Sequence, residues 1–318
     1  MKSEVTVVIP YFNESKTIAK TLELIGKQSI PPKEAIIVNS SSTDDSFLVV
    51  DAWINQNQEK FVTRFRNIDK STKNPGSSKN IGIKISKTNW IAFMDCGQKF
   101  PTDWIECQIN YINSKKLDVS FGVVYLNGVN WVDRCAIAQT YGYKQLRSCV
   151  PGTLLKRNVF DATSLFLEGR RSGYDMIWQS KVKKIIEKYD VNSGSRIEYE
   201  GVNFSNTLLG LYKKSILYSR TALGLEGYYT PYFYIFFLMF LIWIFFSMSE
   251  LLIPILAIYI VFRIFLLPIY KSKAVSIYKE HPLESIFGFP ITSVIIDLGK
   301  LTGYFFGIYD YLAKKIFR

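Results

Sequence analysis

The sequence has one histidine, His281, which lies between two strongly apolar regions near the carboxyl end. A Ser/His/Asp triad or a histidine-rich zinc site would have to use that residue. The four cysteines form no Cys-x-x-Cys pair, and the apolar run at Val5 is too short for the core of a secretory signal. We therefore set aside triad and histidine–zinc chemistry, and we expect the cysteines to be reduced thiols.

Basic residues exceed acidic residues, and the formal net charge is +12, but no nucleic-acid motif accompanies the scattered lysines and arginines. Some of them flank two apolar runs: Lys213, Lys214 and Arg220 precede the first, and Lys271, Lys273 and Lys279 follow the second. Anionic headgroups at a cytoplasmic membrane face attract such residues. We predict no nucleic-acid partner and a multi-pass protein of the inner (cytoplasmic) membrane, with its catalytic domain in the cytoplasm.

The apolar runs at residues 231–248 and 251–270 contain almost no charge, and each has about the ~20 residues that span hydrocarbon. Only Glu250 and its neighbours separate them, which predicts a tight hairpin. Arg263 interrupts the second run and is expected to face a protein interior, to snorkel outward or to contact a lipid phosphate.

A third apolar helix is predicted at about 286–308, with Ser293, Asp297 and Lys300 on one face. It either spans the membrane or is re-entrant or interfacial. A span would move the basic residues at the carboxyl end outside, against the positive-inside tendency, so we favour the second reading. Glycines at 299, 303 and 307 allow close helix packing, although that spacing alone is a weak signal.

The predicted domains follow from these changes in composition. Residues 1–204 form a soluble α/β domain, residues 205–227 an amphipathic interfacial helix and linker with a boundary near Gly227, and residues 228–318 the membrane region. Within the first domain, strands are predicted at 5–9, 35–38, 61–68, 90–94 and 118–127. Helical patterns between the first four predict a parallel sheet, whose loops converge on one edge.

Asp95 follows the apolar run Trp90–Met94, which is typical of a strand covered on both faces. Ligands in open α/β sheets bind just beyond the carboxyl ends of such strands. Aspartate is also common at strand ends because it caps turns, and the two interpretations are evenly matched on this stretch alone.

Four ordered motifs resemble those of the family 2 glycosyltransferases, in particular the membrane-attached bacterial type with carboxyl-terminal transmembrane helices. They are VVIPYFNE at 7–14, IVNSSSTD at 37–44, SKNIG at 78–82 and FMDCGQKFPTDWIE at 93–106, and a fifth, GYD at 173–175, is similar to the acidic pair that opens a late helix. The resemblance covers about residues 5–190. It implies a GT-A (Rossmann-like) fold, with a mixed sheet flanked by helices and followed by the helical membrane region.

The resemblance also implies an inverting transfer of a sugar from a nucleotide-diphosphate donor to a lipid-linked or polysaccharide acceptor. A UDP-sugar is favoured, with GDP- and dTDP-sugars as alternatives. Asp95 would hold Mg²⁺ or Mn²⁺, and Asp175 would act as the general base. The implied donor-binding residues are Pro10, Tyr11, Asn13, Glu14, Asn39, Ser40, Lys79, Asp95, Cys96 and Gly97.

Several positions depart from the family pattern. Asn39 and Ser40 replace the paired acids of the second motif, and Gly97 replaces the second acid of the Asp-x-Asp motif. Mg²⁺ often uses one carboxylate together with substrate phosphates, so Asp95 alone is expected to hold the ion only when donor is bound. The departures leave an alternative, a catalytically impaired GT-A-like protein that serves as a nucleotide-sugar-binding or assembly subunit.

Two features near the late helix have ordinary explanations as well. Asp175 in a first helical turn complements the helix dipole, worth roughly 0.3–1 kcal/mol, whatever its chemistry. Arg170 and Arg171 precede that helix. They are predicted to grip a donor or lipid-carrier phosphate, or else to be solvated surface charges.

Overall fold

The computed structural model describes residues 3–70, 72, 74–200, 207–225 and 228–316. Its contacts divide the chain into two compact units: residues 1–125 with 146–199, and residues 126–145 with 200–318. The boundary predicted near Gly227 lies outside the described residues.

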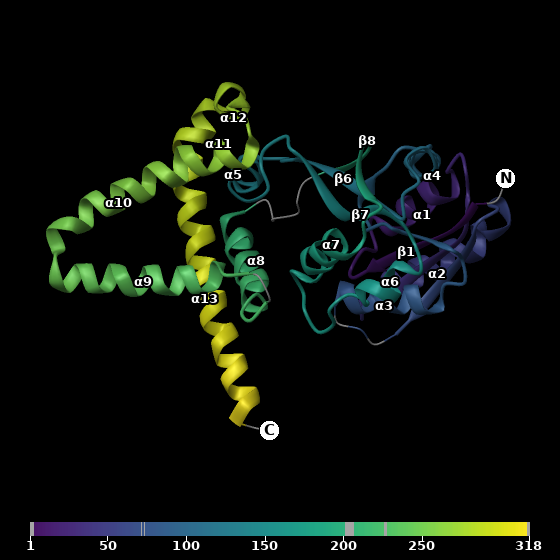
Figure 1. Ribbon diagram of the computed structural model, residues 1–318, viewed down its shortest axis with the longest axis horizontal. Coiled ribbons are helices and arrows are strands. Elements are labelled where there is room, and N and C mark those ends of the chain that lie inside the picture. Colours follow the sequence, from purple (N-terminus) through teal and green to yellow (C-terminus); the bar gives the residue numbers. More distant parts are fainter. Residues whose placement is uncertain (1–2, 71, 73, 201–206, 226–227, 317–318) are drawn as a thin grey trace. The chain divides into compact units, whose positions relative to one another are not determined.

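The first unit is an α/β domain, whose elements are labelled in Figure 1. Its strands are β1 (Ser3–Tyr11), β2 (Pro32–Asn39), β3 (Arg64–Asp69), β4 (Trp90–Phe93), β5 (Gln98–Lys99), β6 (Val119–Asn127), β7 (Leu146–Lys156) and β8 (Tyr189–Glu200). Its helices are α1 (Ile18–Gly26), α2 (Ser46–Asn57), α3 (Pro75–Ile85), α4 (Trp104–Lys115), α6 (Val159–Thr163) and α7 (Tyr174–Ile185), with a 3₁₀ turn at Gln58–Lys60.

The eight strands form one mixed sheet in the order β3-β2-β1-β4-β7-β6-β8-β5. β2 and β4 pair in parallel with β1, and β3 pairs in parallel with β2, so the loops after these four strands meet at one edge. β7 is antiparallel to both β4 and β6, so the strand predicted at 118–127 belongs to an antiparallel part. The mixed sheet confirms the predicted fold class.

The apolar stretch of β4 is buried on both faces. Ala92 and Met94 belong to one hydrophobic core, while Ile91 and Phe93 belong to the other, and all four are fully buried. Alternate residues of a strand point to opposite faces, so two cores with interleaved members are expected for a central strand. The double burial holds the end of β4, and therefore Asp95, in a fixed position.

The second unit is helical (Figure 1). It contains α5 (Trp131–Thr140), α8 (Leu208–Arg220), α9 (Thr230–Ser247), α10 (Leu252–Val261), α11 (Leu267–Ser272), α12 (Ser276–Glu280) and α13 (Phe289–Ile316), with a 3₁₀ turn at Ser249–Leu251 and π-helical turns at Phe262–Leu266 and Glu284–Gly288. Within the described residues, three stretches are long and apolar enough to cross a membrane: Thr230–Ser247, Ser249–Ser272 and Glu284–Ala313.

Helix α5 is an element for which the sequence pattern gave no prediction. Asn130 caps it by accepting a hydrogen bond from the Asp133 amide at 3.0 Å. The Arg134 guanidinium donates to both carboxylate oxygens of Glu284, at 2.8 and 2.5 Å. This charge pair joins residues 150 positions apart, which no local pattern reveals.

Arg263 faces the protein interior, which is one of the three placements predicted for it. Its side chain is only 6% exposed, and its Nε lies 3.0 Å from an Asp297 carboxylate oxygen. Tyr234 also donates a hydrogen bond to Asp297 at 2.6 Å, and Tyr259 donates to the other carboxylate oxygen. A single carboxylate on α13 therefore links both arms of the α9–α11 hairpin.

Candidate functional site

Asp95 lies directly beyond the carboxyl end of β4 and forms an ion pair with Lys79 of α3. Lys79 Nζ lies 2.7 Å from Asp95 Oδ1, and the lysine side chain is fully buried while that of Asp95 is 27% exposed. The Asp95 amide donates to the Gln98 side chain at 3.1 Å, which fixes the turn. A buried ammonium group needs such a partner, so Lys79 and Asp95 are positioned as a unit.

The first turn of α7 comes to the same place. The ring of Tyr174 lies 5.8 Å from Lys79 Nζ, and Asp175 follows it. Burial raises the pKa of Asp175, the Lys79 charge lowers it, and the Asp95 carboxylate raises it further, with the net shift upward. Elements β4, α3 and α7 thus bring Asp95, Lys79 and Asp175 together. A carboxylate with a raised pKa beside a second acid is a candidate general base.

Glu14 and Cys96 border this cluster. Burial raises the pKa of Glu14, the Thr17 hydroxyl opposes the shift by hydrogen bonding, and the Asp95 charge adds to it. Burial also raises the pKa of Cys96 well above its usual value, and the charges of Glu14 and Asp95 act in the same direction. Cys96 therefore packs as a neutral thiol, whereas Glu14 supplies a second acid close to Asp95.

The loops after β1 and β2 are tied to each other by short hydrogen bonds. Asn13 has a left-handed backbone (φ 56°), and its side-chain oxygen accepts from the Thr43 amide at 2.8 Å. The Ser40 amide donates to the carbonyl of Tyr11 at 2.8 Å. The Ser40 hydroxyl in turn lies 2.7 Å from that of Ser78 on α3. These bonds bring Asn13, Ser40 and Ser78 of the first three motifs together at this edge of the sheet. Pro10 and Tyr11, the last two residues of β1, are buried.

Asn39 does not replace the missing acid on its own. Its amide nitrogen donates to Asp69 Oδ1 at 3.0 Å, and its oxygen accepts from the Ser42 amide at 2.9 Å. Asp69 ends β3, next to Asn39 in the parallel register. The carboxylate absent from the β2 loop is therefore present one strand away, a substitution that no motif spacing indicates.

Arg170 and Arg171 lie in the loop before α7. That loop is anchored by Asn80 of α3. Its side-chain nitrogen donates to the Phe166 carbonyl and to Glu168, both at 2.9 Å, and its oxygen accepts from the Phe166 amide at 2.9 Å. Asn80, Gln98 and Asp69 are the supporting residues that sequence reasoning missed.

The donor set for a metal ion consists of Asp95 with open space next to it. Among the residues that the structure describes, no three His, Cys, Asp or Glu side chains cluster as a metal site. A Cβ atom on Gly97 would meet nothing within 4 Å, so room remains beside the Asp95 carboxylate, whose Oδ1 already pairs with Lys79. One carboxylate oxygen fits Mg²⁺ or Mn²⁺ only when phosphate oxygens complete the coordination.

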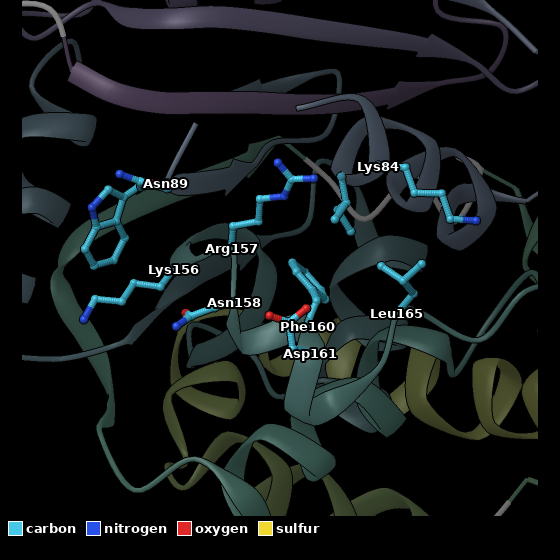
Figure 2. Close-up of a pocket in the computed structure, with 10 residues that line it drawn as sticks. Lys84, Asn89, Lys156, Arg157, Asn158, Phe160, Asp161 and Leu165 are labelled. Atoms are coloured by element: carbon cyan, nitrogen blue, oxygen red, sulfur yellow. The ribbon is translucent and has the colours of Figure 1, made fainter. Parts of the chain in front are cut away.

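A cavity of about 790 Å³ lies elsewhere in the first unit. Its lining includes Trp90, the first residue of β4, and Lys156, the last of β7, so it is at the opposite end of β4 from Asp95. In Figure 2, Arg157 extends between Asn89 and Lys84. None of the predicted site residues lines this cavity.

Residues 6–158 match the family described as "Glycosyl transferase family 2". Over this segment, just under half of its length, the chain resembles a family 2 glycosyltransferase. The matched segment includes Lys79 and Asp95 and ends before Arg170, Arg171 and Asp175.

Two curated relatives are similar to part of this chain. "Glycosyltransferase GlyG" of Streptococcus pneumoniae serotype 4 is 29% identical over 125 residues, which is 39% of this chain and 40% of that protein. The Escherichia coli "UDP-Glc:alpha-D-GlcNAc-diphosphoundecaprenol beta-1,3-glucosyltransferase WfaP" is 29% identical over 122 residues, 38% of this chain and 46% of that protein. The matches thus span less than half the length of these relatives.

A solved structure supports the fold over most of the chain. The mannosyltransferase PcManGT of Pyrobaculum calidifontis, in complex with GDP-Man and Mn²⁺, superposes with a TM-score of 0.55 at 12% identity, covering 95% of this chain and 87% of that one. The expected GT-A fold is confirmed.

Proposed function

We propose that this chain is an inverting glycosyltransferase that moves a sugar from a nucleotide-diphosphate donor to a lipid-linked or polysaccharide acceptor at the cytoplasmic membrane face. One observation carries the proposal: the buried Lys79 ammonium lies 2.7 Å from Asp95, at the end of β4, with Asp175 close enough for both charges to affect its pKa. A cation, an exposed metal-binding oxygen and a base are the groups that sugar transfer from a diphosphate requires.

Each of these residues has a defined task in the proposed reaction. Asp175 takes the proton from an acceptor hydroxyl as that oxygen attacks the anomeric carbon from the side opposite the diphosphate, which inverts the configuration. A divalent ion held by Asp95 would neutralise the charge that develops on the leaving diphosphate. Lys79 holds the Asp95 carboxylate in place and adds a fixed positive charge under the site.

The names of two relatives support a lipid-linked or polymer acceptor. WfaP is named for transfer to a sugar on diphosphoundecaprenol, and a Bacillus spizizenii relative, 26% identical over 129 residues, is named a poly(ribitol-phosphate) beta-glucosyltransferase. The apolar helices of the second unit support membrane attachment, because long uncharged helices are soluble only in lipid or inside a protein.

Donor turnover by the purified full-length protein tests the proposal. UDP-, GDP- and dTDP-sugars would each be incubated with Mg²⁺ or Mn²⁺, and release of nucleoside diphosphate measured with and without lipid-linked acceptors. We expect nucleoside diphosphate to be released from one donor class. Asp95→Ala should abolish this release, whereas Asp161→Asn should retain it, because Asp161 is an exposed residue that lines the cavity at the other end of β4. If the protein bound a donor but released no nucleoside diphosphate with any donor, metal ion or acceptor, the alternative of a nucleotide-sugar-binding subunit would be favoured instead.

We expect Asp69→Asn to weaken binding of the nucleotide sugar about 10- to 100-fold. The Asp69 carboxylate lies at the end of β3, beside Asn39 and the loop after β2, where we propose that the nucleobase binds. A hydrogen bond to a charged group contributes about 1.5–3 kcal/mol. Uracil and guanine both carry a ring N–H that a carboxylate can accept. Titration calorimetry with donor, and with inorganic pyrophosphate as a ligand that lacks a base, checks this. Equal weakening for both ligands would contradict a role in base recognition.

We also expect the free protein to bind Mn²⁺ weakly, and donor to increase the affinity at least about tenfold. The reason is that Asp95 is the one acid left in its Asp-x-Asp motif, and no cluster of three metal-binding side chains is found among the described residues, so phosphate oxygens must provide further ligands. Electron paramagnetic resonance of free Mn²⁺, measured with and without donor, gives both constants. Tight binding without donor, unchanged in Asp95→Ala, would show that the ion is held elsewhere.

A further inference from the structure

Helix α13 has surroundings unlike those of the other apolar helices. In its most apolar window, 39% of the residues are buried inside the protein, compared with 11% in each of Thr230–Ser247 and Ser249–Ser272. We propose that α13 lies in the plane of the membrane, along the headgroup boundary of one leaflet, and that only the α9–α11 hairpin enters the bilayer. The proposal concerns membrane topology and does not depend on the transferase activity.

The carboxyl-terminal half of α13 is covered by the amphipathic helix α8. A Cβ atom on Gly299, Gly303 or Gly307 would come within 2.6 Å of α8 atoms, so the two backbones are in contact along about two turns. Arg220 of α8 donates to both carboxylate oxygens of Asp310, at 2.6 and 2.7 Å, in an exposed ion pair. A spanning α13 would carry α8, with this pair and its lysines, into hydrocarbon, where charged groups are costly.

The amino-terminal half of α13 and the turn before it are covered by α5 in the same way. Arg134 of α5 pairs with Glu284, and Gln139 accepts a hydrogen bond from Ser293 at 2.8 Å. The Gln139 nitrogen also donates to Thr292 at 2.8 Å. Helices α5 and α8, which carry these charged and hydrogen-bonding side chains, therefore accompany α13 on one side from its first turns to Asp310, so that stretch is not enclosed by lipid.

The opposite side of α13 carries an apolar stripe suited to the acyl boundary. It consists of Ile291, Val294, Leu298, Phe305, Tyr309 and Leu312, whose exposed fractions are between 45% and 71%. At the ~3.6 residues per turn of an α-helix, these positions fall within about 60° of each other. Aromatic and aliphatic side chains in such a stripe are typical of a helix that lies in the interface.

The hairpin meets α13 at Asp297, near the middle of the helix, through Tyr234, Tyr259 and Arg263. Figure 1 shows α9 and α10 extending from α13 at a steep angle. An orientation that inserts the hairpin into a bilayer consequently lays α13 flat on its surface. Both ends of a hairpin are on one side, so the carboxyl terminus is on the side where α9 begins, in agreement with the positive-inside tendency for its basic residues.

Reporter fusions to the full-length protein test the sidedness. Green fluorescent protein and alkaline phosphatase would each be fused before Met1 and after Arg318, since the first fluoresces when it remains in the cytoplasm and the second is active only when exported. We expect fluorescence and no phosphatase activity at both ends. Active phosphatase after Arg318, together with a cytoplasmic amino end, would overturn the proposal.

Depth measurements distinguish an in-plane helix directly. Val294→Cys, Leu298→Cys, Phe305→Cys and Leu312→Cys would be spin-labelled in a Cys107→Ser/Cys149→Ser background, because these two native thiols are partly exposed whereas Cys96 and Cys135 are buried. Labelling of the background protein alone is subtracted. For each label we would measure accessibility to oxygen, which concentrates in lipid, and to a polar nickel reagent, which stays in water. We expect the ratio of the two accessibilities to be the same at all four positions. A spanning helix would separate positions 294 and 305 by about 16 Å in depth, and such a gradient would refute the proposal.

Discussion

Replacing Asp175 by asparagine is expected to lower kcat about 10²- to 10⁴-fold while leaving donor affinity within about twofold. General base catalysis contributes a factor of this size, and asparagine keeps the volume and the hydrogen bonding to the helix amides but cannot accept the proton. Steady-state transfer assays combined with donor titration measure the two effects. Asp161→Asn is the matched control, because it makes the same chemical change at an exposed position that lines the cavity at the opposite end of β4.

The pH profile gives an independent test of the same residue. The base must be deprotonated to act, and burial raises its pKa above the usual aspartate range. Activity should therefore be complete well above this raised pKa and fall as the pH decreases through it, with a midpoint higher than that of an exposed aspartate. Transfer by Asp175→Asn that retained the acidic limb of the wild-type profile would assign that limb to another group.

Asp95→Ala is expected to abolish transfer and to lower the free energy of unfolding by about 3 kcal/mol. The variant leaves the fully buried Lys79 ammonium without its carboxylate, and breaking a buried ion pair from one side costs about 3–5 kcal/mol, with the lower end suited to a partly exposed partner. Urea denaturation of the full-length protein in detergent measures the stability, and nucleoside diphosphate release measures the chemistry.

The double variant Lys79→Met with Asp95→Ala separates the two roles. Removing both charges should restore most of the lost stability, since a methionine of similar length fills the buried space without a charge, but it should restore no activity. Unchanged stability in Asp95→Ala alone would mean that water replaces the carboxylate. Recovery of transfer in the double variant would remove Asp95 from the proposed chemistry.

Local patterns in the chain were sufficient for the class of the fold. The apolar run of β4 predicted a strand covered on both faces, and Ile91 to Met94 are indeed fully buried on alternating sides. Uncharged runs likewise predicted the apolar helices. These features depend on residues close together in sequence, through strand alternation, helical periodicity and the cost of exposing apolar side chains to water.

Contacts between distant segments could not be read from such patterns. Asn39 and Asp69 are 30 positions apart, and only the parallel register of β2 and β3 reveals that a carboxylate of the neighbouring strand lies beside Asn39. The same holds for α5, which is recognisable as part of the helical unit through its pairing with Glu284. A mixed composition without a clear apolar face gave no signal for that helix.

The stretch around Asp95 combines both kinds of information. Its motif and its place after a buried strand predict a ligand site from the order of residues alone, and Gly97 predicts weak metal binding there. That Lys79 is fully buried against Asp95, and that Asp175 shares their electrostatic environment, depended on α3 and α7 packing at the end of β4. Strand ends are specified by nearby residues, whereas charges that act on one another across 16 and 80 positions of sequence are brought together by tertiary packing.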